Sequence, residues 1–220
     1  MDSVVSFARW MPAGLQNAAE TGTSVRAVIF EDDIAIWRGQ DGLARAWQNR
    51  CPHRGMRLSY GIVRENRLTC LYHGWTYDGT GGCAHIPAHP DLVPPKSIRA
   101  KAYGCVETGG MIWVARSESS EPPPQISGTW MPCRTMQVNR SLTGLAEVLG
   151  TGKANLALAM GAWAGQLRVA GLQGAVLLAV QPMGARGAML HACVTGPEDL
   201  TRASDWIESL RGHLERPIAA

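Results

Sequence analysis

Hydrophobic and polar residues alternate in short runs through the first half of the chain. In the stretch SVRAVIFEDDIAIWR, residues 24–38, two alternating runs flank the acidic residues Glu31, Asp32 and Asp33, which predicts a β-hairpin that turns at these acids. The further runs LARAWQN, RLTCLY, SIRAKAY and MIWVAR are separated by stretches rich in Gly, Pro and Asn. We therefore predict a small all-β domain over residues 1–116, with little regular helix.

A segment rich in Pro and Ser follows this domain. The text SESSEPPPQISG, within residues 117–129, contains three consecutive prolines together with Ser and Glu. This composition favours an extended, solvated linker. We expect a second unit over residues 130–220.

The second unit is predicted to combine antiparallel strands with a C-terminal helix. The runs GAVLLAVQ and GAMLHACV flank the turn PMGAR and predict an antiparallel pair. After Pro197, which suits a first helical turn, apolar residues recur at three- and four-residue spacing up to Pro217: Leu200, Ala203, Ile207, Leu210 and Leu214. The stretch KANLALAMGAWAG fits a helix or a buried strand equally well. The predicted fold class is mainly β with an α+β tail.

Composition narrows the classes of partner and compartment. The 220 residues are 45% hydrophobic, enough to bury a core without disulfides, and the net charge is +3 with no run of like charges. We expect no nucleic-acid partner. The start MDSVVSFARWMPAG lacks a charged region followed by an apolar one, and no 18 consecutive apolar residues occur, so we predict a cytoplasmic protein with no membrane partner. Its six cysteines are then expected as thiols or metal ligands.

Two short motifs carry the candidate chemistry. Cys51-x-His53 and Cys70-x-x-His73 supply two thiolates and two imidazoles from two loops of the β domain. A structural zinc is the lesser alternative, because zinc loops usually pair Cys with Cys and His with His. A 2Fe-2S cluster that places two Cys on one iron and two His on the other needs one ligand of each kind from each loop. The remaining alternative, unrelated core cysteines and surface histidines, requires four coincident positions.

Charge explains why such a cluster would use imidazole. Two ferric ions, two sulfides and two thiolates sum to zero, whereas four thiolates leave two negative charges, so an electron is added more easily to the His-ligated cluster. The residues Pro52, Gly55, Gly61 and Gly74 suit loops in which backbone N–H groups approach the sulfides closely.

The sequences CPHRGMRLSYG and CLYHGWTYDGTGGC resemble the cluster-binding motif of the large subunits of Rieske non-haem iron oxygenases. The resemblance extends to IPAHP and YGCVETGGMIWV and covers nearly all of residues 1–116. It implies a Rieske-type all-β cluster domain in which Cys51 and Cys70 bind one iron and His53 and His73 bind the other. Around these ligands we expect a second group of residues, among which Trp75 shields the cluster: Arg54, Gly55, Tyr72, Gly74 and Trp75.

A departure from the respiratory proteins with the same cluster favours the oxygenase branch. Those proteins carry an additional Cys in each loop, joined in a disulfide, and here Met56 and Tyr72 stand at these positions.

The resemblance ends after the linker. The family's catalytic domain, a helix-grip fold, holds a mononuclear iron through an Asp/Glu-x2-His-x4-His motif, which is absent from this sequence. Only His191 and His213 follow the linker; we expect the first to be packed on a strand and the second to be solvated. We therefore predict a truncated helix-grip-like unit at residues 130–220, a 2Fe-2S cluster as cofactor and no mononuclear iron.

These features together predict an electron carrier of an oxygenase system. A reductase or ferredoxin would donate the electron, and an oxygenase subunit with mononuclear iron would receive it, within a homo- or hetero-oligomer. Two alternatives remain. The chain could be a complete oxygenase, a hydroxylase or demethylase of a small organic substrate, with an unorthodox iron site. It could also be a non-catalytic, redox-responsive accessory subunit.

Overall fold

The computed structural model describes residues 10–115, 122–140, 145 and 164–216, which form two compact units. The first unit contains residues 17–106 and 114–115, and the second contains residues 10–16, 107–113 and the described residues from 122 onward. The domain boundaries inferred from the sequence stay a prediction. Part of the expected linker, residues 117–121, and most of KANLALAMGAWAG, residues 153–163, lie outside the described residues.

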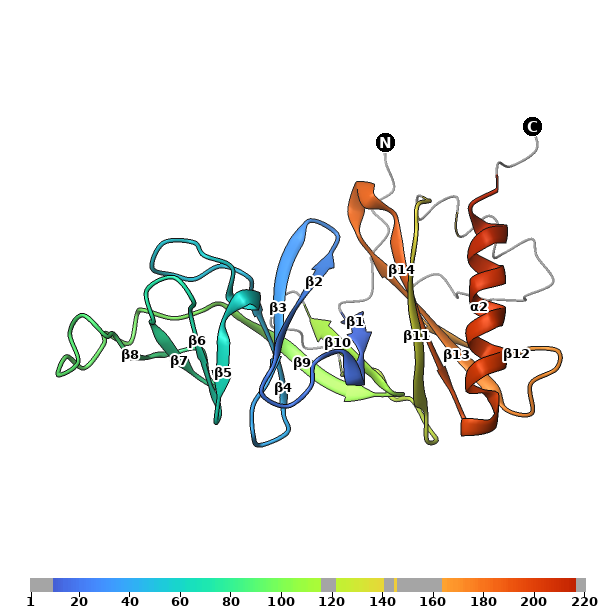
Figure 1. Cartoon of the computed structure of the whole chain (residues 1–220), viewed down its shortest axis with the longest axis horizontal. Helices are drawn as coiled ribbons and strands as arrows, with labels where there is room; N and C mark the ends of the chain where they lie inside the picture. Colours follow the sequence, from blue (N-terminus) through green and yellow to red (C-terminus); the bar gives the residue numbers. More distant parts are fainter. Residues whose placement is uncertain (1–9, 116–121, 141–144, 146–163, 217–220) are drawn as a thin grey trace. The chain divides into compact units, whose positions relative to one another are not determined.

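Two antiparallel sheets build the first unit (Figure 1). In one, the strand order is β9-β4-β3-β2, and in the other it is β5-β6-β7-β8. The strands are β2 (Ser24–Ile29), β3 (Asp32–Arg38), β4 (Ala44–Gln48), β5 (Ile62–Arg64), β6 (Arg67–Thr69), β7 (Thr76–Asp78), β8 (Cys83–His85) and β9 (Ala102–Thr108), with a 3-10 turn, η2 (Leu58–Tyr60), before β5. Both Cys/His motifs lie in connections that lead into strands of the β5-β6-β7-β8 sheet. One connection lies between β4 and β5, and the other lies between β6 and β7.

The hairpin predicted over residues 24–38 is present, but its turn was placed wrongly. The turn consists of Phe30 and Glu31, while Asp32 and Asp33 pair with the neighbouring strand. Phe30 has a φ of 51°, which allows the chain to reverse within two residues. Asp33 is kept in the strand because its carboxylate binds Arg26 at 2.8 Å on β2.

The strand expected at SIRAKAY begins later than predicted. Residues 97–101 precede β9, which starts at Ala102. Backbone bonds hold this stretch against the β7–β8 hairpin instead, because Cys83 N–H donates to the Ile98 carbonyl and Ala100 N–H donates to the Gly81 carbonyl. These bonds remove the donors and acceptors that a longer β9 would need.

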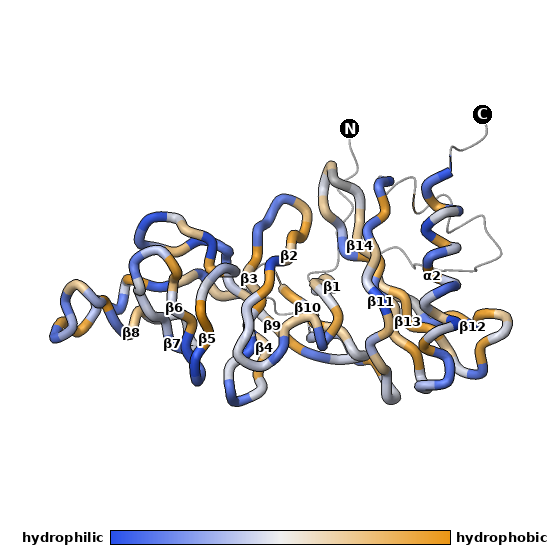
Figure 2. The backbone as a smooth tube through the Cα atoms, viewed as in Figure 1, coloured by the Kyte–Doolittle hydropathy of each residue, from blue (hydrophilic) through white to orange (hydrophobic). Residues whose placement is uncertain are grey.

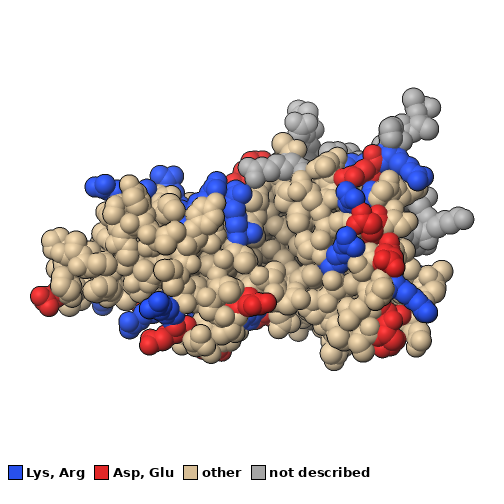
Figure 3. Space-filling model, viewed as in Figure 1, with Lys and Arg blue, Asp and Glu red and all other residues tan. Residues whose placement is uncertain are grey.

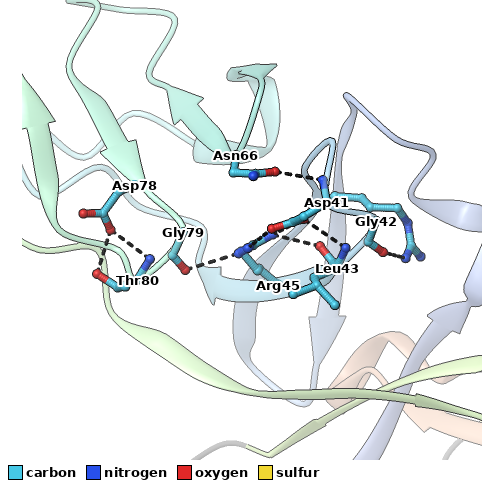
Figure 4. Close-up of polar contacts among 9 residues, drawn as sticks. Asp41, Gly42, Leu43, Arg45, Asn66, Asp78, Gly79 and Thr80 are labelled. Atoms are coloured by element: carbon cyan, nitrogen blue, oxygen red, sulfur yellow. Dashed lines mark hydrogen bonds and ion pairs between the residues drawn. The ribbon is translucent and has the colours of Figure 1, made fainter.

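Arg45 ties the two sheets of this unit together (Figure 4). From β4, its guanidinium binds Asp41 at 2.6 Å and donates to the Gly79 carbonyl in the β7–β8 turn at 3.3 Å. The hydrogen bond from Arg45 lowers the pKa of Asp41 to about 2. The Asp41 N–H donates in turn to Asn66 in the β5–β6 turn. The hairpins that carry the second Cys/His motif are thus anchored to β4.

An aromatic core lies beneath the two motifs. Trp37 and Trp47 meet edge to face with ring centroids 4.8 Å apart, and Tyr77 packs on Trp47 at 6.4 Å. Cys51 and Cys70 belong to the same buried cluster. The two motifs therefore start from rigid, close-packed positions.

The second unit is a sheet covered by one helix. Its sheet has the order β11-β14-β13-β12, with all neighbouring strands antiparallel, and β1 lies beside β10. The predicted hairpin and helix are both confirmed. The elements are β1 (Trp10–Leu15), β10 (Met111–Ala115), β11 (Met131–Val138), β12 (Ala164–Arg168), β13 (Ala175–Pro182), β14 (Ala188–Val194), the 3-10 turns η1 (Gln16–Ala18, at the unit boundary), η3 (Gly184–Arg186) and η4 (Pro197–Asp199), and α2 (Leu200–Leu214).

Helix α2 buries one side against this sheet. Ala203, Ile207 and Leu214 are fully buried against β-strand side chains, while β13 is hydrophobic along most of its length (Figure 2). Asp199 holds the β12–β13 turn by accepting N–H bonds from Gln173 and Gly174. In the part of the chain that the structure describes, no helix is long and apolar enough to cross a membrane.

Candidate functional site

The two Cys/His motifs adopt the same backbone arrangement. In loop 1 (residues 51–56), Cys51 N–H donates to the Met56 carbonyl at 2.8 Å, and Gly55 N–H donates to the Cys51 carbonyl at 2.9 Å. In loop 2 (residues 70–75), Cys70 N–H and Gly74 N–H make the equivalent bonds, at 2.9 and 3.0 Å. Each loop is thus a closed turn that begins at its cysteine.

A glycine in the left-handed region closes each turn. Gly55 has a φ of 76° and Gly74 a φ of 71°, a conformation that costs other residues about 1 kcal/mol or more. Their surroundings differ. A Cβ on Gly74 would lie 2.9 Å from Pro87 Cγ, whereas one on Gly55 would meet only the flexible Arg50 side chain, at 3.4 Å.

The two thiols are buried close to one another. Cys51 is 3% exposed and Cys70 is 2% exposed. Burial raises the pKa of the Cys70 thiol and Cys51 raises it further, while N–H groups of Tyr72 and His73 act in the opposite direction. Two thiolates placed here repel each other, so both can be ionised only beside a cation.

The two imidazoles lie together and are only half-buried. The ring centroids of His53 and His73 are 4.7 Å apart. Trp75 stacks on His53 at 4.2 Å with the planes 5° apart, and Tyr72 covers His73 at 3.8 Å. Burial lowers the pKa of His53, with smaller contributions from His73 and Arg54, which favours the neutral form that binds metal.

The donor set suits a binuclear centre. Among the described residues, no three Cys, His, Asp or Glu side chains surround one common point. Instead, one buried pair of thiols and one half-exposed pair of imidazoles come from two equivalent loops. A 2Fe-2S cluster with two thiolates on one iron and two imidazoles on the other uses such pairs.

The structure brings all the predicted site residues to these two loops. Arg54 is exposed beside His53, Gly55 and Gly74 close the turns, Tyr72 is 60% exposed and Trp75 is half-buried against His53. The predicted shielding role of Trp75 is consistent with its stacking. The role of each of these residues toward a bound cluster stays a prediction.

Tyr77 was missed by the sequence reasoning. Its hydroxyl lies 3.1 Å from the Cys51 sulfur, and both burial and Cys51 raise the pKa of Tyr77 above its usual value. The phenol therefore stays protonated and can donate to a thiolate. The alternation of TYD in β7 predicts only that this side chain is buried, so the sequence contains no further sign of its contact.

Asn49 was also missed, and it anchors loop 1. Its side-chain N–H donates to Asp33 at 2.8 Å and to Ser59 Oγ at 2.9 Å, while its Oδ1 accepts the Ser59 N–H at 2.7 Å. Burial disfavours the ionised Asp33, but bonds from Arg26 and Asn49 outweigh it and lower the pKa of this carboxyl. Asn49 stands two residues before Cys51, but the sequence contains no sign of its bonds to Asp33 and Ser59.

Comparison with known proteins identifies the domain that contains these loops. Residues 9–101 match the Rieske [2Fe-2S] domain. This chain carries a Rieske domain. Its cofactor is accordingly a Rieske-type 2Fe-2S cluster, as predicted, and the paired thiols and paired imidazoles of the two loops suit that group.

The relatives of this Rieske domain include an oxidoreductase and a demethylase. Oxidoreductase NdmD of Pseudomonas putida is 40% identical over 119 residues, which is 54% of this chain and 20% of NdmD. Methylxanthine N1-demethylase NdmA of the same organism is 44% identical over 75 residues, 34% of this chain and 21% of NdmA. The chain thus spans about a fifth of the length of these curated relatives.

Solved structures extend the likeness in fold beyond the Rieske domain. The crystal structure of apo dicamba monooxygenase superposes with a TM-score of 0.71 at 18% identity, and the match covers 95% of this chain and 83% of that one. The mainly β fold with a C-terminal helix is therefore confirmed.

Neither later histidine joins a metal site in the described residues. His191 on β14 is 1% exposed, with Nδ1 2.8 Å from Thr135 Oγ1 and Nε2 2.7 Å from Gln181 Oε1, as a packed histidine should be. His213 is exposed on α2, as predicted. Both ring nitrogens of His191 are thus occupied by protein partners.

Proposed function

We propose that this Rieske protein passes single electrons from a reductase or ferredoxin to a partner oxygenase subunit that holds mononuclear iron. The observation that carries the proposal is the contrast between two complete, equivalent ligand loops and a sequence without the Asp/Glu-x2-His-x4-His motif. The relatives named as an oxidoreductase and as a demethylase support a place in an oxygenase system.

In this proposal Cys51 and Cys70 bind one iron, and His53 and His73 bind the other. When bound, the cluster accepts and releases one electron at a time. The buried thiols hold the inner side of the site, and the imidazoles form its half-exposed edge. Trp75 covers one face of His53 and excludes water there.

The proposed partners, oligomeric contacts and cellular location follow from the carrier role. A carrier needs a donor and an acceptor, so we expect transient complexes with both, and the shortened second unit as a contact region in a homo- or hetero-oligomer. A cytoplasmic location fits the free thiols, since the cysteines form no disulfide in the structure.

Counting iron and acid-labile sulfide per chain, in protein prepared without air, tests the proposal. Two irons and two sulfides are expected. Three irons to two sulfides would indicate a mononuclear site and a self-sufficient oxygenase, which contradicts the carrier role. Zinc without sulfide would contradict the cluster assignment itself.

Ligand variants test the assignment residue by residue. Cys51→Ser and Cys70→Ser should each abolish the visible absorption of the cluster and reduce the iron count to about zero, because serine is a poor ligand for iron in this setting. Cys133→Ser, a half-buried thiol outside both loops, is the matched control and should keep two irons. Full absorption and electron uptake in Cys51→Ser would refute the assignment.

A further inference from the structure

A basic hollow lies directly beside loop 1. It has a volume of about 410 Å³, and Cys51, Pro52 and His53 form part of its wall. Four cationic side chains also line it, and no acidic residue does: Arg50, Arg54, Arg99 and Lys101. Each of the four is exposed.

The basic character of this region exceeds that of the whole chain. Residues 50–101 contain 8 Lys and Arg against 3 Asp and Glu, whereas the remainder contains 13 against 15. Figure 3 shows blue side chains along the upper edge of the part formed by the first unit, while red and blue alternate over α2. The excess positive charge is therefore concentrated in residues 50–101, the stretch of chain that contains both ligand loops.

The nearby acids lie outside this hollow, in a neighbouring hollow and at the β7–β8 turn. Glu31, Asp32 and Asp33 line a neighbouring hollow that shares Arg50, but Asp33 is held by Arg26 at 2.8 Å and approached by Arg57 at 3.5 Å. On the other side, Asp78 faces Arg99, while its oxygens accept bonds from Thr80 and Gly82 in its own turn. The hollow itself keeps four cations around the approach to His53.

We propose that this hollow is the docking site of an acidic electron-donor protein. The proposal rests on the proposed function, because it names the donor's entry point. Charge complementarity is the argument: an open surface lined by exposed cations attracts carboxylates on a partner and raises the rate of encounter. One electron then passes from the reduced donor to the oxidised cluster at the His53 edge, so the donor loses one electron and the cluster gains one, with no bond made or broken.

The surface of loop 2 is apolar, in contrast to the basic hollow beside loop 1. The proposal therefore concerns the loop 1 side only. The exposed residues of loop 2, Leu71 and Tyr72, are apolar or aromatic, at 56% and 60% exposure. An acidic donor gains no electrostatic attraction from these side chains. The structure therefore assigns the donor to the loop 1 side.

The test follows reduction of the cluster in the full chain by a reduced, acidic plant-type ferredoxin, whose low potential makes the transfer favourable. The double variant Arg99→Gln with Lys101→Gln removes two cations without touching loop 1. Arg64→Gln with Arg67→Gln is the matched control: it makes the same charge change at exposed positions that do not line the hollow. Equilibrium binding of oxidised ferredoxin is measured in parallel, and dithionite reduction reports that the cluster is intact.

At low salt, about 50 mM, the Arg99/Lys101 variant should react roughly tenfold more slowly than the parent, and the control should stay within about twofold. At about 500 mM salt the three proteins should converge, because the Debye length falls to a few ångströms. Inorganic phosphate at matched ionic strength should slow the reaction no more than chloride does.

Each other outcome is decisive. If the Arg99/Lys101 variant reacts as fast as the parent, the docking site is wrong while the carrier function stands. If ferredoxin binds through Arg99 and Lys101 but never reduces a cluster that dithionite reduces, the carrier function is wrong while the docking site stands. If ferredoxin neither binds nor reduces, both are overturned. Saturable inhibition by phosphate would identify a small-anion site and overturn the docking proposal.

Discussion

The two ligand loops share a backbone but differ in what surrounds them. Both close through the same pair of hydrogen bonds and a glycine in the left-handed region. Loop 1 is fixed from below by the buried amide of Asn49 and is surrounded by arginines, whereas loop 2 packs on Pro87 and exposes Leu71 and Tyr72. The backbone thus provides equivalent ligand positions, and the side chains make the two sides of the site chemically distinct.

The difference explains how a symmetric ligand arrangement can serve an asymmetric task. A carrier meets a donor and an acceptor, and discrimination between partners depends on differences in charge and apolar surface. Variants that act on one loop and spare the other measure how independent the two loops are.

The largest effect is expected at the anchor of loop 1. Asn49→Ala removes three hydrogen bonds from a side chain that is 3% exposed and leaves the Ser59 N–H without a partner. We expect a loss of about 3 kcal/mol in the free energy of unfolding and faster loss of iron to a chelator. Urea unfolding and iron release measure this.

Asn66→Ala provides the control for this variant. Asn66 is exposed and makes one bond, to the Asp41 N–H, so its removal should cost about 1 kcal/mol or less and leave iron retention unchanged. Equal iron release from the two variants would show that Asn49 does not hold loop 1 specifically.

Alanine variants of the two closing glycines test whether the loops are equivalent in backbone conformation only, or also in the packing around them. Gly55→Ala should cost about 1 kcal/mol, because it places a Cβ at positive φ beside a flexible side chain. Gly74→Ala adds a 2.9 Å contact with the rigid Pro87 ring, so we expect about 2–3 kcal/mol. Thermal unfolding of the loaded protein ranks the two variants, and an equal cost would contradict the packing difference.

The sequence predicts the ligand loops well because their information is local. Cys51, His53, Cys70 and His73 are fixed by spacing within two short motifs, and the strands around them alternate clearly. The hairpin turn at Phe30 was misplaced because Asp33 is retained in its strand by Arg26, a contact between strands. Tyr77 and Asn49 were missed for the same reason. Their partners are Cys51 and Ser59, and the residue pattern along β7 or just after β4 does not encode such pairs.

The buried His191, which lies outside both loops, should make the stability of the protein depend on pH. Burial lowers the pKa of His191 to about 4, so between pH 6.5 and about 4 the unfolded chain takes up a proton that the folded chain refuses. Stability is therefore unaffected above pH 7 and falls as the pH decreases, by about 2 kcal/mol at pH 5. Urea unfolding at pH 7 and pH 5 measures the loss. His191→Gln should be less stable at pH 7 but lack this part of the pH dependence. If the free energy of unfolding of this variant fell between pH 7 and pH 5 as much as that of the parent, the pH dependence would come from other groups.

The smallest expected effect concerns the contact that distinguishes the two thiols. Tyr77→Phe removes the hydroxyl that lies 3.1 Å from the Cys51 sulfur in loop 1. It leaves the side chains of loop 2 unchanged. A hydrogen bond donated to a thiolate favours the reduced, more negative cluster, so its loss should lower the midpoint potential. If the bond contributes about 1.4 kcal/mol to this difference, the shift is about 60 mV for a one-electron couple. Redox titration of the loaded variant measures the shift, with the iron count as the check that the cluster is retained. A potential equal to that of the parent, with two irons bound, would mean that the Tyr77 hydroxyl does not interact with the bound Cys51 sulfur.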